Sequence, residues 1–414
     1  MQKVSGPGNT YRELQKILVR SGQAEKAPAW IFGSSINTLS FVRSLGRRGI
    51  PCVVLDRLPM IGAESRFTHF VPISLSDLSS EEGIACLRHA AKSSTSKPVI
   101  FATSDEHNEF LARHGGKLEE HCRFLVPRPE TIDLVLNKRE QYTIAEKIGV
   151  PLPLSLYPES LEDIVSYKDR MRFPCIIKPC MAHVGRQLLG GKKVRVVETY
   201  DDLKKQWGLL GSRSSEFMIQ EIIPGGDSDL FGYLALWSHD CQEIAWVTKQ
   251  KLRQNPPEYG DGALQKTVIC EEARELSKRL LKELGYQGFV GVEFKKDPRD
   301  GRLKLMEINP RTVSGNQLAI SSNIDFPYIA YNYLTDPEYC YSGSFKPDVS
   351  FINEDRNFRA YIILRKKGRM RLTKYLSELF NSDSRAIWAW DDLRPAWCTF
   401  RVLFRDMIRK LRKF

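Results

Sequence analysis

Residues 288–311, GFVGVEFKKDPRDGRLKLMEINPR, decide the fold of this chain. Two runs of strand-forming residues flank DPRDG, a segment of turn residues, so the pattern predicts a β-hairpin. With the turn centred on Asp300, Glu293 lies directly across from Glu307. Side chains alternate between the two faces of a strand, which puts Glu307 and Asn309 on one face. The hairpin is therefore expected to gather two carboxylates and an amide.

This trio is a candidate metal site. Carboxylates opposed across a hairpin have Cβ atoms about 4.5–5.5 Å apart and repel each other unless a cation lies between them. Two acids and an amide oxygen form an all-oxygen set suited to Mg²⁺, which retains waters and bridges phosphates. A hairpin with solvated glutamates has the same spacing, so the spacing alone leaves both interpretations open.

Two upstream motifs favour a nucleotide. Lys178 ends the compact strand FPCIIKP (173–179) and precedes a loop that contains Gly185, a pattern able to lay an ammonium and backbone N–H groups against phosphate. The loop does not have the Walker A sequence. MIQEIIPGG (218–226) ends a strand with an acid, an apolar pair and a turn, as expected where a backbone hinge binds an adenine edge. Alone, each motif also fits an ordinary surface lysine or turn.

In this order and spacing, VEF…LMEINPR, IIKP and QEIIPG resemble the ATP-grasp superfamily of ligases, over roughly residues 130–335. Within it the chain looks most like the carboxylate–amine ligases related to D-aspartate ligase and carbamoyl phosphate synthetase. KLRQNPPEYGDGA (251–263) is similar to a segment that the former group carries on its substrate side. The resemblance implies an ATP-dependent ligase that uses Mg²⁺, or Mn²⁺ in its place, to join a small carboxylate to an amine through an acyl phosphate.

The resemblance also implies roles for individual residues. Phosphates would be contacted by Lys138 and Lys178, and magnesium would be bound by Glu293, Glu307 and Asn309. Adenine and ribose would be held by Glu221, the backbone near Ile223, and Asp229, for which Asp227 is a competitor. Arg311 would lie near the transferred phosphate. The glycine loop departs from the family pattern because its serine–glycine pair is missing.

Two further residues are candidates for substrate contacts. His183 lies in the glycine loop, although a loop histidine is more often incidental. Arg253 could clamp an acceptor carboxylate, since a planar guanidinium suits bidentate pairing. The alternative for Arg253 is a surface arginine in a proline-rich loop.

The expected fold class is α/β, with a Rossmann-like domain before a two-lobed α+β ATP-grasp domain and a small C-terminal extension. Residues 29–56 read as strand, helix and strand, but GSSINT is not GxGxxG, so a nicotinamide-binding oxidoreductase is the weaker alternative. The expected boundaries are an N-terminal extension (1–28), the Rossmann-like domain (29–129), the ATP-grasp domain (130–335) and the C-terminal extension (336–414).

Composition and charge limit the possible compartment and partners of the protein. Nine cysteines without ligand spacing and the lack of a long apolar run favour a cytoplasmic protein with reduced thiols. The net charge of +12 comes with no nucleic-acid-binding signature, so no nucleic-acid partner is expected. The basic, amphipathic end WCTFRVLFRDMIRKLRKF (397–414) could lie on the inner, anionic face of a membrane or pack on the protein. A catalytically idle ATP-binding scaffold held there by its tail is a further alternative.

Overall fold

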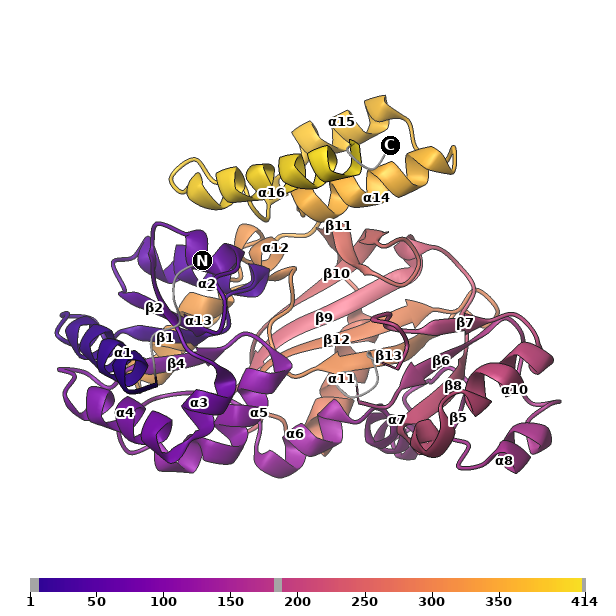
Figure 1. The fold of residues 1–414 in the computed structure, drawn as a ribbon, viewed down its shortest axis with the longest axis horizontal. Coiled ribbons are helices and arrows are strands. Elements are labelled where there is room, and N and C mark those ends of the chain that lie inside the picture. Colours follow the sequence, from indigo (N-terminus) through magenta and orange to yellow (C-terminus); the bar gives the residue numbers. More distant parts are fainter. Residues whose placement is uncertain (1–6, 182–187, 412–414) are drawn as a thin grey trace.

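The computed structural model describes residues 7–181 and 188–411 and consists of three sheets with their covering helices (Figure 1). The first sheet has the strand order β3-β2-β1-β4, all parallel. Its strands are β1 Ala29–Phe32, β2 Cys52–Asp56, β3 Thr68–Pro72 and β4 Val99–Ala102. Every residue of β1 and β4 is buried, as expected for parallel strands covered on both faces by helices.

The helices of this first domain are α1 Pro7–Gly22, α2 Ile36–Gly46, α3 Leu75–Ser79, α4 Glu81–Lys92 and α5 Asp105–His114. α1 packs against α4, and its Leu14 and Leu18 belong to the same apolar core as Trp30 of β1. The N-terminal extension expected before residue 29 therefore contributes a helix to this domain's core. α6 Pro129–Leu136 and α7 Lys138–Lys147 follow.

The second sheet is small and antiparallel, with the order β5-β8-β6-β7. Its strands are β5 Ser155–Leu156, β6 Cys175–Pro179, β7 Arg195–Val197 and β8 Phe217–Glu221. α8 Leu161–Ser166 and α10 Tyr200–Gly208 cover it. The predicted strand FPCIIKP and the predicted strand at the start of MIQEIIPGG are confirmed as the central pair, β6 and β8.

The third sheet has seven strands in the order β13-β12-β9-β10-β11-β14-β15. They are β9 Leu230–Trp237, β10 Glu243–Asn255, β11 Asp261–Thr267, β12 Gly288–Lys296, β13 Leu303–Asn309, β14 Ser350–Ile352 and β15 Ser384–Arg385. α11 Glu271–Glu283, α12 Asn316–Ser321 and α13 Phe326–Thr335 lie between these strands in sequence. The C-terminal extension thus supplies the last two strands of the central sheet.

The two faces of the seven-stranded sheet bury different cores. Tyr233, Val292 and Phe294 pack with α7 and α11 on one face. Leu236 and Val247 pack on the other face, in a core shared with β1, α2 and α13. The first domain is therefore joined to the central sheet by a continuous apolar contact.

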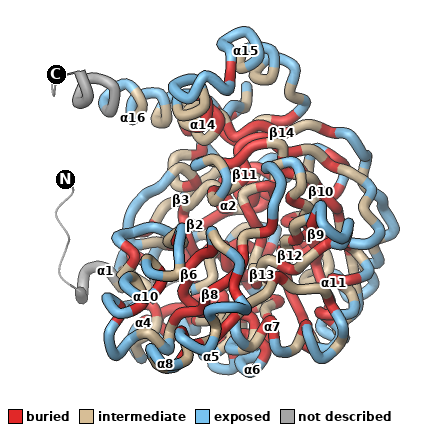
Figure 2. The backbone as a smooth tube through the Cα atoms, turned by 90° about the vertical axis from the view of Figure 1, so that its right-hand side faces the viewer, coloured by how far each residue is buried: buried red, intermediate tan, exposed pale blue. Residues whose placement is uncertain are grey.

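The last three helices, α14 Glu354–Lys366, α15 Leu372–Asn381 and α16 Arg394–Leu411, form a layer beyond β11 and β14 (Figures 1 and 2). None of the helices among the described residues has a stretch of apolar sequence sufficient to cross a bilayer. All nine cysteines are described and free, and five of them are buried.

Candidate active site

The predicted hairpin is formed by β12 and β13. Glu293 pairs directly with Glu307, and Gly291 pairs with Asn309, so the predicted register is confirmed. The Asn309 side-chain amide donates to Glu307 Oε1 over 3.2 Å, while its oxygen accepts from Arg311 Nη2 over 3.3 Å. One end of the hairpin therefore presents two carboxylates, an amide and a guanidinium together.

Two lysines reach this hairpin from outside the central sheet. Lys138 begins α7, where its backbone N–H donates to Cys180 O, and its Nζ lies 3.9 Å from Glu307 Oε2. Lys178 projects from β6, and its Nζ donates to the Tyr142 hydroxyl over 3.2 Å. That hydroxyl donates to Met306 O on β13 over 2.9 Å, so Tyr142 links the small sheet to the hairpin. The site therefore lies where the second and third sheets meet.

Opposite charges hold Glu307 ionised. Burial opposes ionisation, but Lys138, Lys193 and Lys251 outweigh it and lower the pKa of Glu307 to about 2. Burial also lowers the pKa of Lys178 to about 8, although the charge of Glu307 partly opposes this shift. The carboxylate and the cations around it therefore shift one another's pKa values, and perturbed pKa values of this kind cluster at functional sites.

β10 adds three cations that line up on one face. Along this face the side chains change from apolar (Ala245, Val247) to Lys249, Lys251 and Arg253. Lys251 Nζ donates to Glu293 Oε2 over 2.8 Å. The two strands are separated by β9, where Gly232 pairs with both Lys249 and Glu293 and has no side chain to block the contact.

Lys249 forms no salt bridge with any described residue, although the charges of Glu293 and Asp261 act on it from farther away. It is 3% exposed, and its ammonium donates to Gln265 Oε1 over 2.7 Å. The Gln265 amide nitrogen is buried without an acceptor. Burial lowers the pKa of Lys249 to about 8. Sequence reasoning missed Lys249, Lys251 and Gln265; the alternation KQKLR in a strand was the available signal.

Arg311 joins the hairpin to the first domain. Its Nε lies 2.8 Å from Asp105 Oδ1, at the start of α5. Nearby, Arg356 of α14 donates to Ser314 Oγ over 2.7 Å, and its Nη2 lies 3.2 Å from Asp261 Oδ2. Asp261 Oδ1 lies 2.6 Å from Lys193 Nζ. All three parts of the chain therefore contribute side chains around the hairpin end.

Other predicted residues have partners within the protein. The Glu221 carboxylate accepts from Leu154 N over 2.9 Å and pairs with Arg299 over 2.8 Å. Asp229 accepts from Gly226 N over 2.8 Å, and its competitor Asp227 accepts from Gln254 N over the same distance. Ile223 is buried after β8. His183 and Gly185 lie outside the described residues.

Arg253 is not in a loop. It lies buried in β10, so the surface-loop alternative was wrong. Its guanidinium binds both oxygens of Glu378 in α15, over 2.6 and 2.9 Å, and the Asn357 oxygen over 2.7 Å. The bidentate pairing expected with a substrate carboxylate is made here with a carboxylate of the chain itself.

Comparison with known proteins agrees with this geometry. Residues 238–354 match the family described as ATP-grasp in the biosynthetic pathway with Ter operon. The structure resembles that of an N5-carboxyaminoimidazole ribonucleotide synthetase in complex with ADP, with a TM-score of 0.60 at 16% identity, over 83% of this chain and 86% of the other. The fold is therefore the ATP-grasp fold, as the motifs predicted.

Sequence relatives extend the comparison. D-aspartate ligase of Enterococcus faecium is 24% identical over 349 residues, 77% of this chain and 79% of the relative. The large chain of carbamoyl phosphate synthase from Vibrio parahaemolyticus is 25% identical over 224 residues, 52% of this chain but 20% of the relative. The resemblance inferred from the motifs is confirmed, and these relatives support ATP-dependent carboxylate–amine ligation.

Proposed function

We propose that this protein activates a small carboxylic acid with ATP and joins it to an amine. The observation that carries the proposal is the cluster at the meeting of the second and third sheets, where Lys138 lies 3.9 Å from Glu307 of the Glu293–Glu307 pair and Lys178 is linked to the hairpin through Tyr142. Such a set combines cations for phosphate oxygens with hard oxygen ligands for a divalent ion. We also propose that the ATP-grasp domain spans residues 130–335, between the Rossmann-like domain and the C-terminal extension.

The nucleotide would lie between these two sheets. Lys138 and Lys178 would contact its phosphates, Asp229 its ribose, and the 221–223 segment its adenine. The Glu221 carboxylate already accepts from Leu154 N and pairs with Arg299. Its backbone and that of Ile223 are therefore the groups left to bind the adenine edge.

The donor set fits magnesium. Glu293 and Glu307 oppose each other, Asn309 supplies an amide oxygen, and Glu307 stays ionised because its pKa is lowered to about 2, with burial opposed by neighbouring lysines. Among the described residues, no group of three or more His, Cys, Asp and Glu side chains is placed to hold a metal, so the amide is the third protein ligand of this proposal. Bound there, the ion would screen the charge of the triphosphate.

The reaction would proceed in two displacements. A carboxylate oxygen attacks the γ-phosphorus and ADP leaves, which gives an acyl phosphate. The amine nitrogen then attacks the acyl carbon, the C–O bond to phosphate breaks, and the amine loses a proton. Arg311, fixed by Asp105 and Asn309, would stabilise charge on the transferred phosphoryl group. Positioning and charge stabilisation would be the main contributions of the protein.

We assign the carboxylate of the acid substrate to Lys249 and Gln265. The Lys249 ammonium is buried with one neutral partner, and the Gln265 amide nitrogen has no acceptor. A buried cation beside a buried donor without an acceptor is costly unless an anion binds there. Lys251, in contrast, is already neutralised by Glu293 over 2.8 Å.

The test is acyl-phosphate trapping. The protein would be incubated with ATP, magnesium, hydroxylamine and a panel of carboxylic acids. The panel includes D-aspartate, because one relative is named D-aspartate ligase. We expect a hydroxamate and a matching amount of ADP with one panel member, and loss of both products in Lys178→Met. Lys147→Met, whose side chain is 74% exposed, is the matched control. ADP release that depends on no carboxylate would refute the proposed chemistry.

The same assay separates the other interpretations. An idle scaffold would bind ATP without consuming it, and an oxidoreductase would form neither product. The nicotinamide-binding interpretation has little support in the first domain. The acid that ends β2, Asp56, already accepts hydrogen bonds from the protein itself, from Ser34 N (2.8 Å) and Ser34 Oγ (2.7 Å). The peripheral membrane position expected for the basic C-terminal helix is likewise a proposal.

A further inference from the structure

The C-terminal layer is firmly attached to the body on one side. Arg43 of α2 is 2% exposed and donates to the Asp392 carboxylate over 2.9 Å and to Ile387 O over 2.7 Å. Asp392 also accepts from Ser65 Oγ over 2.7 Å. α16 starts directly after this anchor and extends away from the rest of the molecule (Figure 2). Its orientation is therefore fixed at its N-terminal end.

One exposed face of α16 is largely aromatic. Leu393, Trp397, Phe400 and Phe404 recur at helical spacing and are 45, 62, 57 and 49% exposed. The rings of Trp397, Phe400 and Phe404 stack in sequence, with centroids 5.9 and 6.1 Å apart. An exposed apolar stripe on one face of a helix is typical of an interaction surface. Met407, Ile408, Leu411 and Phe414, which continue the stripe in the sequence, lie beyond the described side chains.

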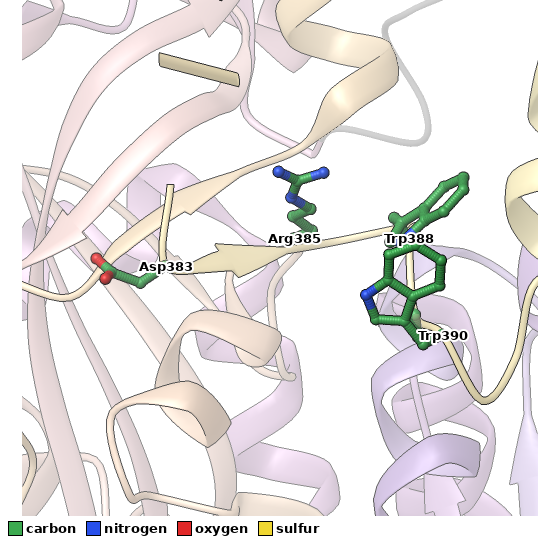
Figure 3. Close-up of a pocket in the computed structure, with 5 residues that line it drawn as sticks. Asp383, Arg385, Trp388 and Trp390 are labelled. Atoms are coloured by element: carbon green, nitrogen blue, oxygen red, sulfur yellow. The ribbon is translucent and has the colours of Figure 1, made fainter. Parts of the chain in front are cut away.

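Two more indoles lie directly before α16. Trp390 is 82% exposed and meets Trp388 edge to face, with centroids 5.3 Å apart. Together with Asp383 and Arg385 they line an open pocket of about 330 Å³ (Figure 3). The Arg385 guanidinium donates to Leu379 O over 3.0 Å and has donors left for a second acceptor.

The acids of this layer are paired with the rest of the protein, whereas most of its basic residues form no salt bridge with a described residue. Residues 365–405 contain four acids, and each has a partner: Glu378 with Arg253, Asp383 with Ser350, Asp391 with Arg47 and Asp392 with Arg43. The same segment contains ten basic residues: Arg365, Lys366, Lys367, Arg369, Arg371, Lys374, Arg385, Arg394, Arg401 and Arg405. Among the described residues, Arg369 alone of these ten forms a salt bridge, with Glu258 at 3.5 Å.

We infer that this layer docks on an anionic lipid bilayer. Trp388, Trp390 and the aromatic stripe of α16 enter the headgroup region, where indoles are favoured because one end is apolar and the other binds water. The arginines beside the stripe bind lipid phosphates, and the pocket at Arg385 admits a headgroup. A protein partner with an apolar groove would explain the aromatic rings but not the excess of unpaired cations. A bilayer explains both features, since basic amphipathic helices lie in anionic interfaces.

The test uses the full chain and vesicle flotation. We expect binding to vesicles that contain phosphatidylglycerol and little binding to pure phosphatidylcholine. The variant Arg394→Gln/Arg401→Gln/Arg405→Gln should weaken partitioning by about fivefold for each charge, roughly 100-fold in total. The matched control is Arg12→Gln/Arg20→Gln/Arg57→Gln, which removes three exposed arginines from the first domain. Equal loss in the two triple variants would show a general charge effect and overturn the inference.

The aromatic stripe is tested separately. Trp397→Ser/Phe400→Ser should abolish flotation at an unchanged melting temperature, whereas Leu209→Ser/Ile269→Ser, at sites 70 and 63% exposed elsewhere, should not. Quenching of tryptophan fluorescence by brominated lipid should fall in Trp390→Phe. Self-association that Trp397→Ser/Phe400→Ser abolishes, without vesicle binding by the wild type, would assign the stripe to a second copy and overturn the inference. Equal flotation with neutral and anionic vesicles would also overturn it.

Discussion

Replacing Lys249 by methionine should stabilise the protein while weakening its binding of the acid. Burial lowers the pKa of Lys249 from 10.5 to about 8. At about 1.4 kcal/mol for each pH unit, keeping this ammonium charged in the fold costs about 3 kcal/mol at pH 7. Loss of the hydrogen bond to Gln265 offsets about 1 kcal/mol of the gain. Lys249→Met should therefore raise the free energy of unfolding by about 2 kcal/mol without ligand.

The sign of the pH dependence follows from the same pKa. Because the folded-state pKa of Lys249 is lowered, the penalty is fully present below pH 8 and disappears as pH rises to 10.5, where the unfolded chain also loses the proton. The advantage of Lys249→Met should shrink over this window. Urea denaturation at several pH values measures this change in the free energy of unfolding. The control is Lys266→Met, at the partly exposed position that follows Gln265 in β11.

The kinetic arm of this experiment measures the KM for the acid. Loss of a hydrogen-bonded charge partner should raise it by about 10- to 100-fold, with a smaller change in the KM for ATP. A variant that is stabilised but keeps its KM would show that Lys249 is buried for another reason. A variant that is destabilised at pH 7 would refute the electrostatic argument itself.

Three further changes test the site and its supports. Glu307→Gln should lower ADP release by about 100-fold or more at an unchanged fold, because it removes the charge around which the cations gather; near-normal turnover would mean the site is misplaced. Asp392→Asn should cost about 3–5 kcal/mol in urea unfolding by leaving a buried arginine unpaired, whereas Asp391→Asn, in an exposed pair, should cost under about 1 kcal/mol. Glu378→Gln should destabilise the protein and leave the KM for the acid unchanged. A lower KM for the acid would instead show that Arg253 can bind the substrate carboxylate.

The hairpin was predictable because its information is local. DPRDG fixes the turn, the turn fixes the register, and the register places Glu293 opposite Glu307. Lys178 was predictable for a similar reason, since prolines bound its short buried strand. The link from Lys178 through Tyr142 to the hairpin could not be predicted, because it spans 36 residues on one side and 164 on the other.

The C-terminal layer was the part least accessible from sequence. β14 and β15 have three and two residues, too short to give a periodic pattern, and their place depends on the free edge of β11. The pairing of Glu378 and Asp392 with the body could not be predicted either, because each carboxylate binds an arginine far away in the chain. The amphipathic helix at the C-terminus was predictable because its pattern is local; its aromatic exposure was not.

The three cations of β10 show why residue type alone could not assign the substrate site. Lys249, Lys251 and Arg253 look alike in sequence and share one face of one strand. Their roles differ because their neighbours differ: Lys251 meets Glu293 and Arg253 meets Glu378, so both charges are already neutralised. Lys249 meets the neutral Gln265, whose amide nitrogen has no acceptor of its own. Of these three cations, Lys249 alone forms no salt bridge with a described residue, which is the reason to assign it to the anionic substrate.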